Sequence, residues 1–127
     1  MPLTTAGAQF LAKAWTGLNS PTTFSASAFY IGFGDSATAF SVAQTDLIAA
    51  TNKYRKLVTS LVESAGVVTA IATFTTSEAN YEWVEWGTFN AGPNGGTMAG
   101  RKVESPTLGT KVNTQVWSFQ ATITFGA

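Results

Sequence analysis

The segment WSFQATITF at residues 117–125 constrains the fold of this chain more than any other segment. Apolar and polar residues alternate along it. The apolar positions are Trp117, Phe119, Ala121, Ile123 and Phe125, and the polar positions are Ser118, Gln120, Thr122 and Thr124. Successive side chains of an extended strand point to opposite faces, so this period of two indicates one buried and one exposed face. We therefore predict a strand over 112–125 in an antiparallel sheet.

Further segments are predicted to be strands because aromatic and β-branched residues are bounded by turn residues. They are residues 28–34, 53–63, 67–76, 81–90 and 97–104. Residues 64–66 (SAG) predict a hairpin, and residues 91–96 (AGPNGG) predict a second one in which Asn and Gly supply positive φ. Residues 45–48 (TDLI) are interpreted as one helical turn capped at Thr45.

The N-terminal residues 4–15 predict a short helix. Alanines favour the helix, Thr4 or Thr5 is its expected N-cap, and Gly17 is expected to end it. We expect Trp15 to dock this helix on the sheet, and the alternative is an exposed anchor that inserts into a partner.

Together these elements predict an all-β protein with the architecture of an antiparallel β-sandwich or jelly-roll-like single domain over residues 1–127, with a short N-terminal helix. A chain of 127 residues with 45% hydrophobic residues is long enough to bury one core. We expect the hairpin at 81–104, with Trp83, Trp86 and Phe89, to be its centre. The N-terminus has no signal-peptide or membrane-span pattern, so we expect no membrane partner and synthesis in the cytoplasm.

Composition excludes several kinds of chemistry. The chain has no cysteine and no histidine, so thiolate nucleophiles, disulfides and the usual general base near neutral pH are absent. We predict no catalytic, cofactor-binding or metal-binding residues. Lys+Arg and Asp+Glu both number 7, and a phosphate-binding surface needs a basic excess, so no nucleic-acid partner is expected. A surface with only 11% charged residues suits packing against other copies or a larger assembly.

Two motifs have a sharper alternative. Glu82 and Glu85 suggest the paired carboxylates of a glycosidase, but residues three apart on a strand point to opposite faces. We therefore interpret them as solvated or interface charges, and the protein as a non-enzyme. Residues 92–96 superficially resemble a phosphate-binding loop, but a strand pattern follows them instead of a helix.

Several segments carry a family likeness: YIGFGDSATAF (30–40), QTDL and ATNKYRK (within 44–56), ATFTTSEANYEWVEWGTFNA (72–91), GGTMAGRKVES (95–105) and LGTKVNTQVWSFQATITF (108–125). In this order they resemble small virion structural proteins of tailed bacteriophages, in which W-x-E-W-G-x-F-N-A and G-G-T-M-x-x-R-K-V-E strands recur. The resemblance extends from about Thr4 to the end of the chain.

The resemblance implies a structural component without catalytic residues. A compact domain of this size without a stalk fits a capsid decoration (cement) protein on the outer surface of the head, bound to the major capsid protein as a homotrimer. The alternative is a tail or tail-fibre-associated module that binds host-surface carbohydrate through Trp83, Trp86 and residues 92–96. We expect the basic clusters at 53–56 and 101–102 to pair with carboxylates of a neighbouring chain. The predicted contact residues are Phe10, Trp15, Tyr54, Arg55, Trp86, Arg101 and Lys102.

Overall fold

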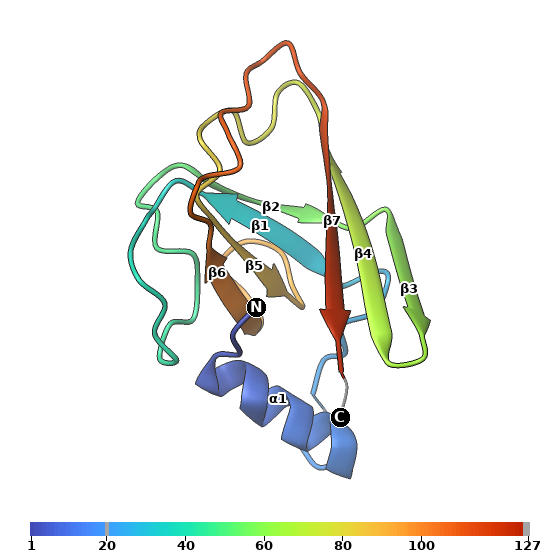
Figure 1. The fold of residues 1–127 in the computed structure, drawn as a ribbon. Helices are drawn as coiled ribbons and strands as arrows, with labels where there is room; N and C mark the ends of the chain where they lie inside the picture. The colour runs from blue at the N-terminus through green and yellow to red at the C-terminus, as the bar shows by residue number, and fades with distance from the viewer. Residues whose placement is uncertain (20, 126–127) are drawn as a thin grey trace.

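The computed structural model describes residues 1–19 and 21–125, and these residues form one helix and seven strands (Figure 1). The elements are α1 Thr5–Thr16, β1 Tyr30–Gly34, β2 Lys53–Leu57, β3 Ser60–Ser64, β4 Val67–Phe74, β5 Glu85–Phe89, β6 Met98–Val103 and β7 Trp117–Thr124. One sheet has the strand order β2-β1-β5-β6 and the other has the order β3-β4-β7, with every pair antiparallel. The predicted all-β sandwich with a short N-terminal helix is confirmed.

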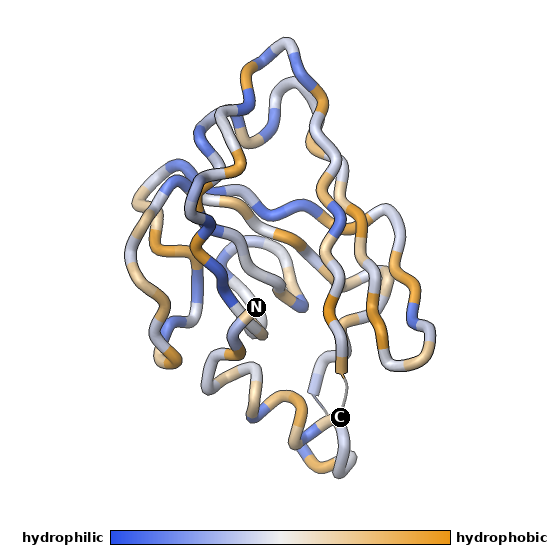
Figure 2. The backbone as a smooth tube through the Cα atoms, in the orientation of Figure 1, coloured by the Kyte–Doolittle hydropathy of each residue, from blue (hydrophilic) through white to orange (hydrophobic). Residues whose placement is uncertain are grey.

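The core lies between the two sheets and is mainly aromatic. Phe33 on β1 stacks on Trp83 with ring centroids 3.8 Å apart, and it meets Phe74 of β4 and Phe119 of β7 edge-on. The β7 side chains alternate as the sequence predicts, since its polar positions are exposed and its apolar positions face the core. Figure 2 shows hydrophobic residues recurring along β4 and β7. Trp83, Trp86 and Phe89 are all buried, as expected for the central hairpin.

One predicted strand is two strands. Residues 53–63 do not form a single element, because β2 ends at Leu57 and β3 begins at Ser60 in the opposite sheet. At this crossing the Val58 N–H donates to the Phe29 carbonyl, and the Thr59 N–H donates to the Ile71 carbonyl. The chain thus passes from one sheet to the other within two residues, both of whose backbone N–H groups are hydrogen-bonded.

The predicted caps of α1 and the predicted turns of the two hairpins are confirmed. The Thr4 hydroxyl accepts the Gly7 N–H at 2.9 Å, and Gly17 ends the helix in the left-handed conformation at φ 70°. In the β5–β6 turn, Asn94 and Gly96 have positive φ, as the turn requires. Gly7 lies so close to β6 that a Cβ there would overlap the Ala99 carbonyl oxygen, so only glycine lets α1 sit against the sheet.

The helix α1 runs across one end of the sandwich, and the long connection between β6 and β7 forms the opposite end (Figure 1). None of the helices formed by residues 1–19 and 21–125 is long and apolar enough to cross a membrane.

Candidate functional site

The residues predicted as contacts fall into two groups. The side chains of Arg55, Trp86 and Arg101 are buried, whereas those of Phe10, Trp15, Tyr54 and Lys102 are exposed or partly exposed. The basic clusters pair with carboxylates of the same chain. The basic clusters thus have carboxylate partners within the chain, and their pairing with a neighbouring chain stays a prediction.

Arg101 on β6 is the most enclosed of the predicted contact residues, with an exposed fraction of 0%. Its Nε donates to the Glu85 carboxylate at 3.0 Å, and its other nitrogens donate to the Gln44 side chain and the Thr38 carbonyl. An ion pair removed from water stays charged only when its remaining hydrogen-bonding groups are also satisfied. Arg101 is therefore an internal residue that no partner can reach, and its predicted role as a contact residue is wrong.

Glu85 holds the connection between β1 and β2. Its carboxylate accepts the backbone N–H groups of Ser36 at 3.2 Å, Ile48 at 2.7 Å and Ala49 at 3.0 Å. The interpretation of Glu85 as a solvated or interface charge is therefore wrong. The predicted helical turn at 45–48 is also wrong, because this backbone is non-helical and its Ile48 N–H donates to Glu85.

Arg55 on β2 holds the turn between β5 and β6. Its Nη1 donates to the carbonyl oxygens of Gly92 at 2.6 Å and Gly95 at 2.9 Å, and its guanidinium carbon lies 3.6 Å from the centre of the Phe89 ring. Its Nη2 pairs with Asp46 at 3.1 Å. Burial favours a higher pKa for Asp46, but hydrogen bonds from Lys53 and Arg55 outweigh it and lower the pKa. Arg55 is likewise an internal residue, not an exposed contact.

Trp86 packs into the core and does not reach the surface as a platform. Its ring lies 5.0 Å from that of Phe119, and its Nε1 donates to Glu104 at 3.0 Å. The same carboxylate pairs with Lys102 at 3.1 Å. Burial favours a higher pKa for Glu104, but these hydrogen bonds lower it. The predicted contact role of Trp86 is wrong, because only 7% of the residue is exposed.

Tyr54 lies in a surface cluster with Lys56 and Glu78. Its hydroxyl donates to the Glu78 carboxylate at 2.6 Å, and Lys56 pairs with the same carboxylate at 2.8 Å. The bond to Glu78 raises the pKa of Tyr54. Burial favours a higher pKa for Glu78, but the hydrogen bonds from Lys56, Tyr54 and Thr75 prevail and lower it to about 2.

We predict that Glu78 makes the domain sensitive to acid. The folded-state pKa of about 2 lies below the ordinary value of 4.5, so ionised Glu78 stabilises the folded state above pH 4.5, and this stabilisation is lost as the pH falls toward 2. In urea unfolding at pH 6 and at pH 2.5, the variant Glu78→Gln should lose less stability on acidification than the natural sequence. An equal loss in both proteins would contradict the prediction.

The described residues do not combine Glu82 and Glu85 into one site. The Glu82 side chain is exposed and accepts a hydrogen bond from the Thr107 hydroxyl at 3.1 Å, whereas Glu85 is fully buried against Arg101. Among residues 1–19 and 21–125, no group of three or more Asp or Glu side chains is placed to hold a metal ion.

Trp15 is the largest exposed apolar side chain of the domain, with 91% of its surface accessible. The expectation that it docks α1 on the sheet is therefore wrong, and its position fits the alternative of an exposed anchor. Leu11 and Trp15 lie four residues apart on one face of α1, and Leu18, which follows the Gly17 cap, is 64% exposed. This apolar stripe thus runs from the sandwich into solvent.

Beside the stripe, an apolar groove opens between α1 and the ends of the two sheets. Its volume is about 430 Å³, and we call it the α1 groove. Its apolar walls include Phe10, Leu11, Phe24, Val62, Ile123 and Phe125. Phe10 meets Phe24 edge-on at 4.8 Å inside it, and the buried Thr88 hydroxyl lies in its wall without a hydrogen-bond partner among the described residues.

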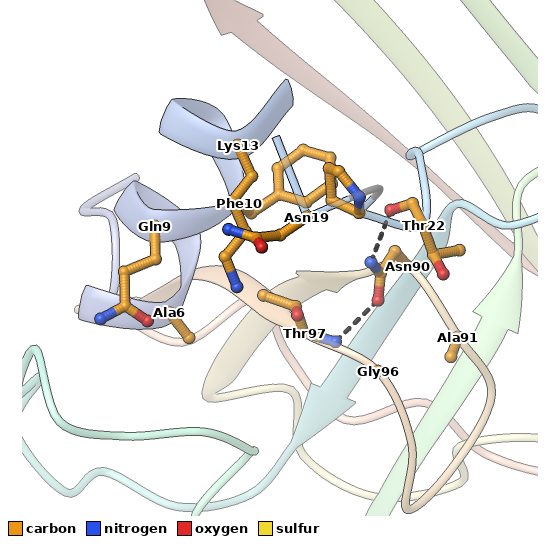
Figure 3. A pocket seen from close by; sticks show the side chains of 11 residues that line it. Ala6, Gln9, Phe10, Lys13, Asn19, Thr22, Asn90, Ala91, Gly96 and Thr97 are labelled. Carbon is orange, nitrogen blue, oxygen red and sulfur yellow. Dashed lines mark hydrogen bonds between the residues drawn. The ribbon is translucent and has the colours of Figure 1, made fainter. Parts of the chain in front are cut away.

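A second cavity of about 350 Å³ lies between α1 and the β5–β6 turn (Figure 3). Its central polar side chain, Asn90, donates to the Thr22 carbonyl at 2.8 Å and accepts the Thr97 N–H at 2.6 Å. Both ends of the amide are thus occupied in holding the turn to the segment after α1.

No protein-family model, curated protein or solved structure matches this chain. Ion pairs within the chain occupy most of the charged side chains. Exposed apolar side chains at the α1 end include those of Trp15, Leu18 and Phe125, and others, such as those of Leu108, Val112 and Val116, lie on the β6–β7 connection. The sequence predicts Phe10 and Trp15 as contact residues but not Val62 or Phe125, which also lie at the α1 end. The spacing of Leu11 and Trp15 on one helix face is the additional signal that the sequence contains.

Proposed function

We propose that this protein is a virion structural protein that decorates the outer surface of a bacteriophage head by binding the major capsid protein. The observation that carries the proposal is the exposed Trp15 beside the apolar α1 groove. A large exposed apolar patch is typical of a protein–protein contact, and Trp is enriched among residues that dominate binding energy. The resemblance to virion structural proteins supplies the partner.

A decoration protein needs no active site. Each copy contributes a modest contact, and copies that bridge several shell subunits release only when all their contacts open together. Binding to the assembled shell but not to its free subunits stabilises the shell by mass action. The aromatic core and the internally tethered loops support this role, because a rigid domain loses little conformational entropy on binding.

The residues that suggested a carbohydrate-binding tail module are not available to bind a sugar. Stacking on a sugar ring requires an exposed aromatic face, but Trp83 is 2% exposed and Trp86 is 7% exposed. In the turn at 92–96, the carbonyl oxygens of Gly92 and Gly95 accept hydrogen bonds from Arg55, as does that of the preceding Ala91. These observations argue against carbohydrate binding through this hairpin.

We expect the purified protein to co-sediment with phage heads that lack it, and Trp15→Ala to weaken this binding by about 30-fold, the effect of removing one dominant contact residue. The matched control is Leu108→Ser, an exposed apolar residue on the β6–β7 connection at the opposite end of the domain. Equal binding by Trp15→Ala and the natural sequence would contradict the contact surface.

Location is tested separately by imaging intact virions with a labelled antibody against this protein. Label distributed over the head supports the proposal. Label confined to the tail contradicts it, whatever the effect of Trp15→Ala.

A further inference from the structure

We propose that the free edge of β7 pairs antiparallel with β7 of a second copy, forming a continuous six-stranded sheet about a two-fold axis. The inference is independent of the proposed function, since it rests on the backbone of one strand. An unpaired strand edge presents a row of N–H and C=O groups that another strand can satisfy, and natural proteins usually block such edges.

The two sheets have four edge strands, which are β2, β6, β3 and β7. Three of these edges are protected against pairing with another strand, and the β7 edge is not. The edge of β2 carries Lys53, Arg55 and Lys56, which disfavour strand addition by their charge. The edge of β6 is covered by the N-terminal segment, because the Thr4 N–H donates to the Ala99 carbonyl and the Arg101 N–H donates to the Pro2 carbonyl.

The remaining two edges belong to the same sheet. The β3 edge is only five residues long and carries Glu63. The β7 edge is eight residues long and contains no charged residue and no proline, and it is the outer strand of its sheet (Figure 1). Long, uncharged edges of this kind are the ones that pair between molecules.

The direction of the free backbone groups follows from one hydrogen bond. The Phe125 N–H donates to the Gly66 carbonyl on the β4 side. Because backbone groups alternate in direction along a strand, residues of odd number in β7 face β4 and residues of even number face outward. The outward groups therefore belong to Ser118, Gln120, Thr122 and Thr124, none of whose N–H groups has another partner among the described residues.

This pattern selects the register. If two β7 strands pair about Ala121, then Gln120 lies opposite Thr122 of the second copy and Ser118 lies opposite Thr124 of the second copy. Every pair of this kind joins two residues whose backbone groups point outward, which is the arrangement of a hydrogen-bonded antiparallel pair. Ala121 then faces Ala121 of the second copy as a non-hydrogen-bonded pair on the axis.

The side chains also match in this register. The exposed face brings together Ser, Thr and Gln side chains without any charge, and such cross-strand polar pairs are favourable. On the core face Phe119 meets Ile123 of the second copy, and Trp117 meets Phe125 of the second copy. The pairing thereby covers Phe125, which is 53% exposed in the single chain, and the partly exposed Phe119 and Ile123.

A contact of this type uses the same surface on both copies, so it yields a closed dimer. On this point the structure leads to a different assembly from the trimer that the resemblance implies.

The test is the mass in solution, measured by sedimentation velocity over a range of concentrations. We expect a particle of twice the chain mass of 13.3 kDa for the natural sequence and of one chain mass for Gln120→Pro, which removes an outward N–H that its own sheet does not use. A monomeric natural protein at all concentrations, or a dimeric Gln120→Pro variant, overturns the proposal.

A second variant separates loss of pairing from loss of folding. Gln120→Lys combined with Thr122→Lys places like charges opposite each other across the axis, at two exposed positions that the single domain tolerates. It should also be monomeric, with an unchanged circular dichroism spectrum. The matched control, Val62→Lys on the exposed β3 edge of the same sheet, should remain dimeric.

The register has its own test because the chain has no cysteine. Under oxidation, Ala121→Cys should form a disulfide-linked dimer across the axis, where non-hydrogen-bonded partners approach most closely. Gln120→Cys should not, because Thr122 of the second copy lies opposite it. Cross-linking at 120 without cross-linking at 121 overturns this register.

Discussion

Arg101→Met is expected to destabilise the domain by about 3–5 kcal/mol, the cost of leaving the buried Glu85 carboxylate without its cationic partner. The substitution keeps the length and apolar stem of the side chain, so packing changes little. It also removes the donors to the Gln44 side chain and the Thr38 carbonyl, and therefore loosens the β1–β2 connection. The measurement is urea unfolding followed by tryptophan fluorescence.

The neighbouring residue supplies the matched control. Lys102 pairs with Glu104 from a side chain that is half exposed, so Lys102→Met should cost less than about 1 kcal/mol. Glu85→Gln combined with Arg101→Met should cost less than the sum of the two single substitutions, because neither charge is then left alone. Equal losses for Arg101→Met and Lys102→Met would contradict the buried pair.

Phe33→Ala is expected to cost about 3–5 kcal/mol, because the side chain is fully buried where both sheets meet. Its ring stacks on Trp83 and meets Phe74 and Phe119 edge-on, so its removal leaves a cavity bounded by rigid rings. The loss should appear in the free energy of unfolding at constant m-value.

Phe33→Leu tests whether volume or aromatic geometry matters more. It keeps most of the buried volume, so the smaller side chain should lower the free energy of unfolding by about 1 kcal/mol. Loss of the aromatic pairs should lower it by a similar amount. If Phe33→Ala were no more costly than Phe33→Leu, the ring would not be part of a close-packed core.

The elements that the sequence predicts well are those specified by local chemistry. The alternation along 117–125, the Thr4 and Gly17 caps and the Asn94 turn each depend on residues within a few positions of one another. The division of 53–63 into two strands has no such local signal, since no glycine or proline marks the crossing. It depends on hydrogen bonds to the distant Phe29 and Ile71.

The candidate site was less predictable for the same reason. Arg101 and Lys102 are adjacent basic residues, yet one is fully buried and the other is half exposed, because alternate residues of β6 face opposite sides of the sheet. The face of the sheet that is buried depends on where residues 35–52 fold back over it. The sequence of that connection has no periodic pattern of apolar residues from which its position could be predicted. Trp15 is the opposite case, an apolar residue that is expected to pack on the sheet and is exposed instead. Its exposure depends on how far α1 extends past the sheets.

The internal ion pairs also have a kinetic consequence. Lys53, Arg55, Lys56, Arg101 and Lys102 pair with four carboxylates of the same chain, Asp46 being shared by Lys53 and Arg55, and the formal net charge is zero. With no net charge, such a molecule gains little long-range electrostatic steering to accelerate its encounter with a partner. Association with another copy or with a shell then depends on random orientation at close range. The association rate should therefore change little with ionic strength, because there is little electrostatic attraction for salt to screen.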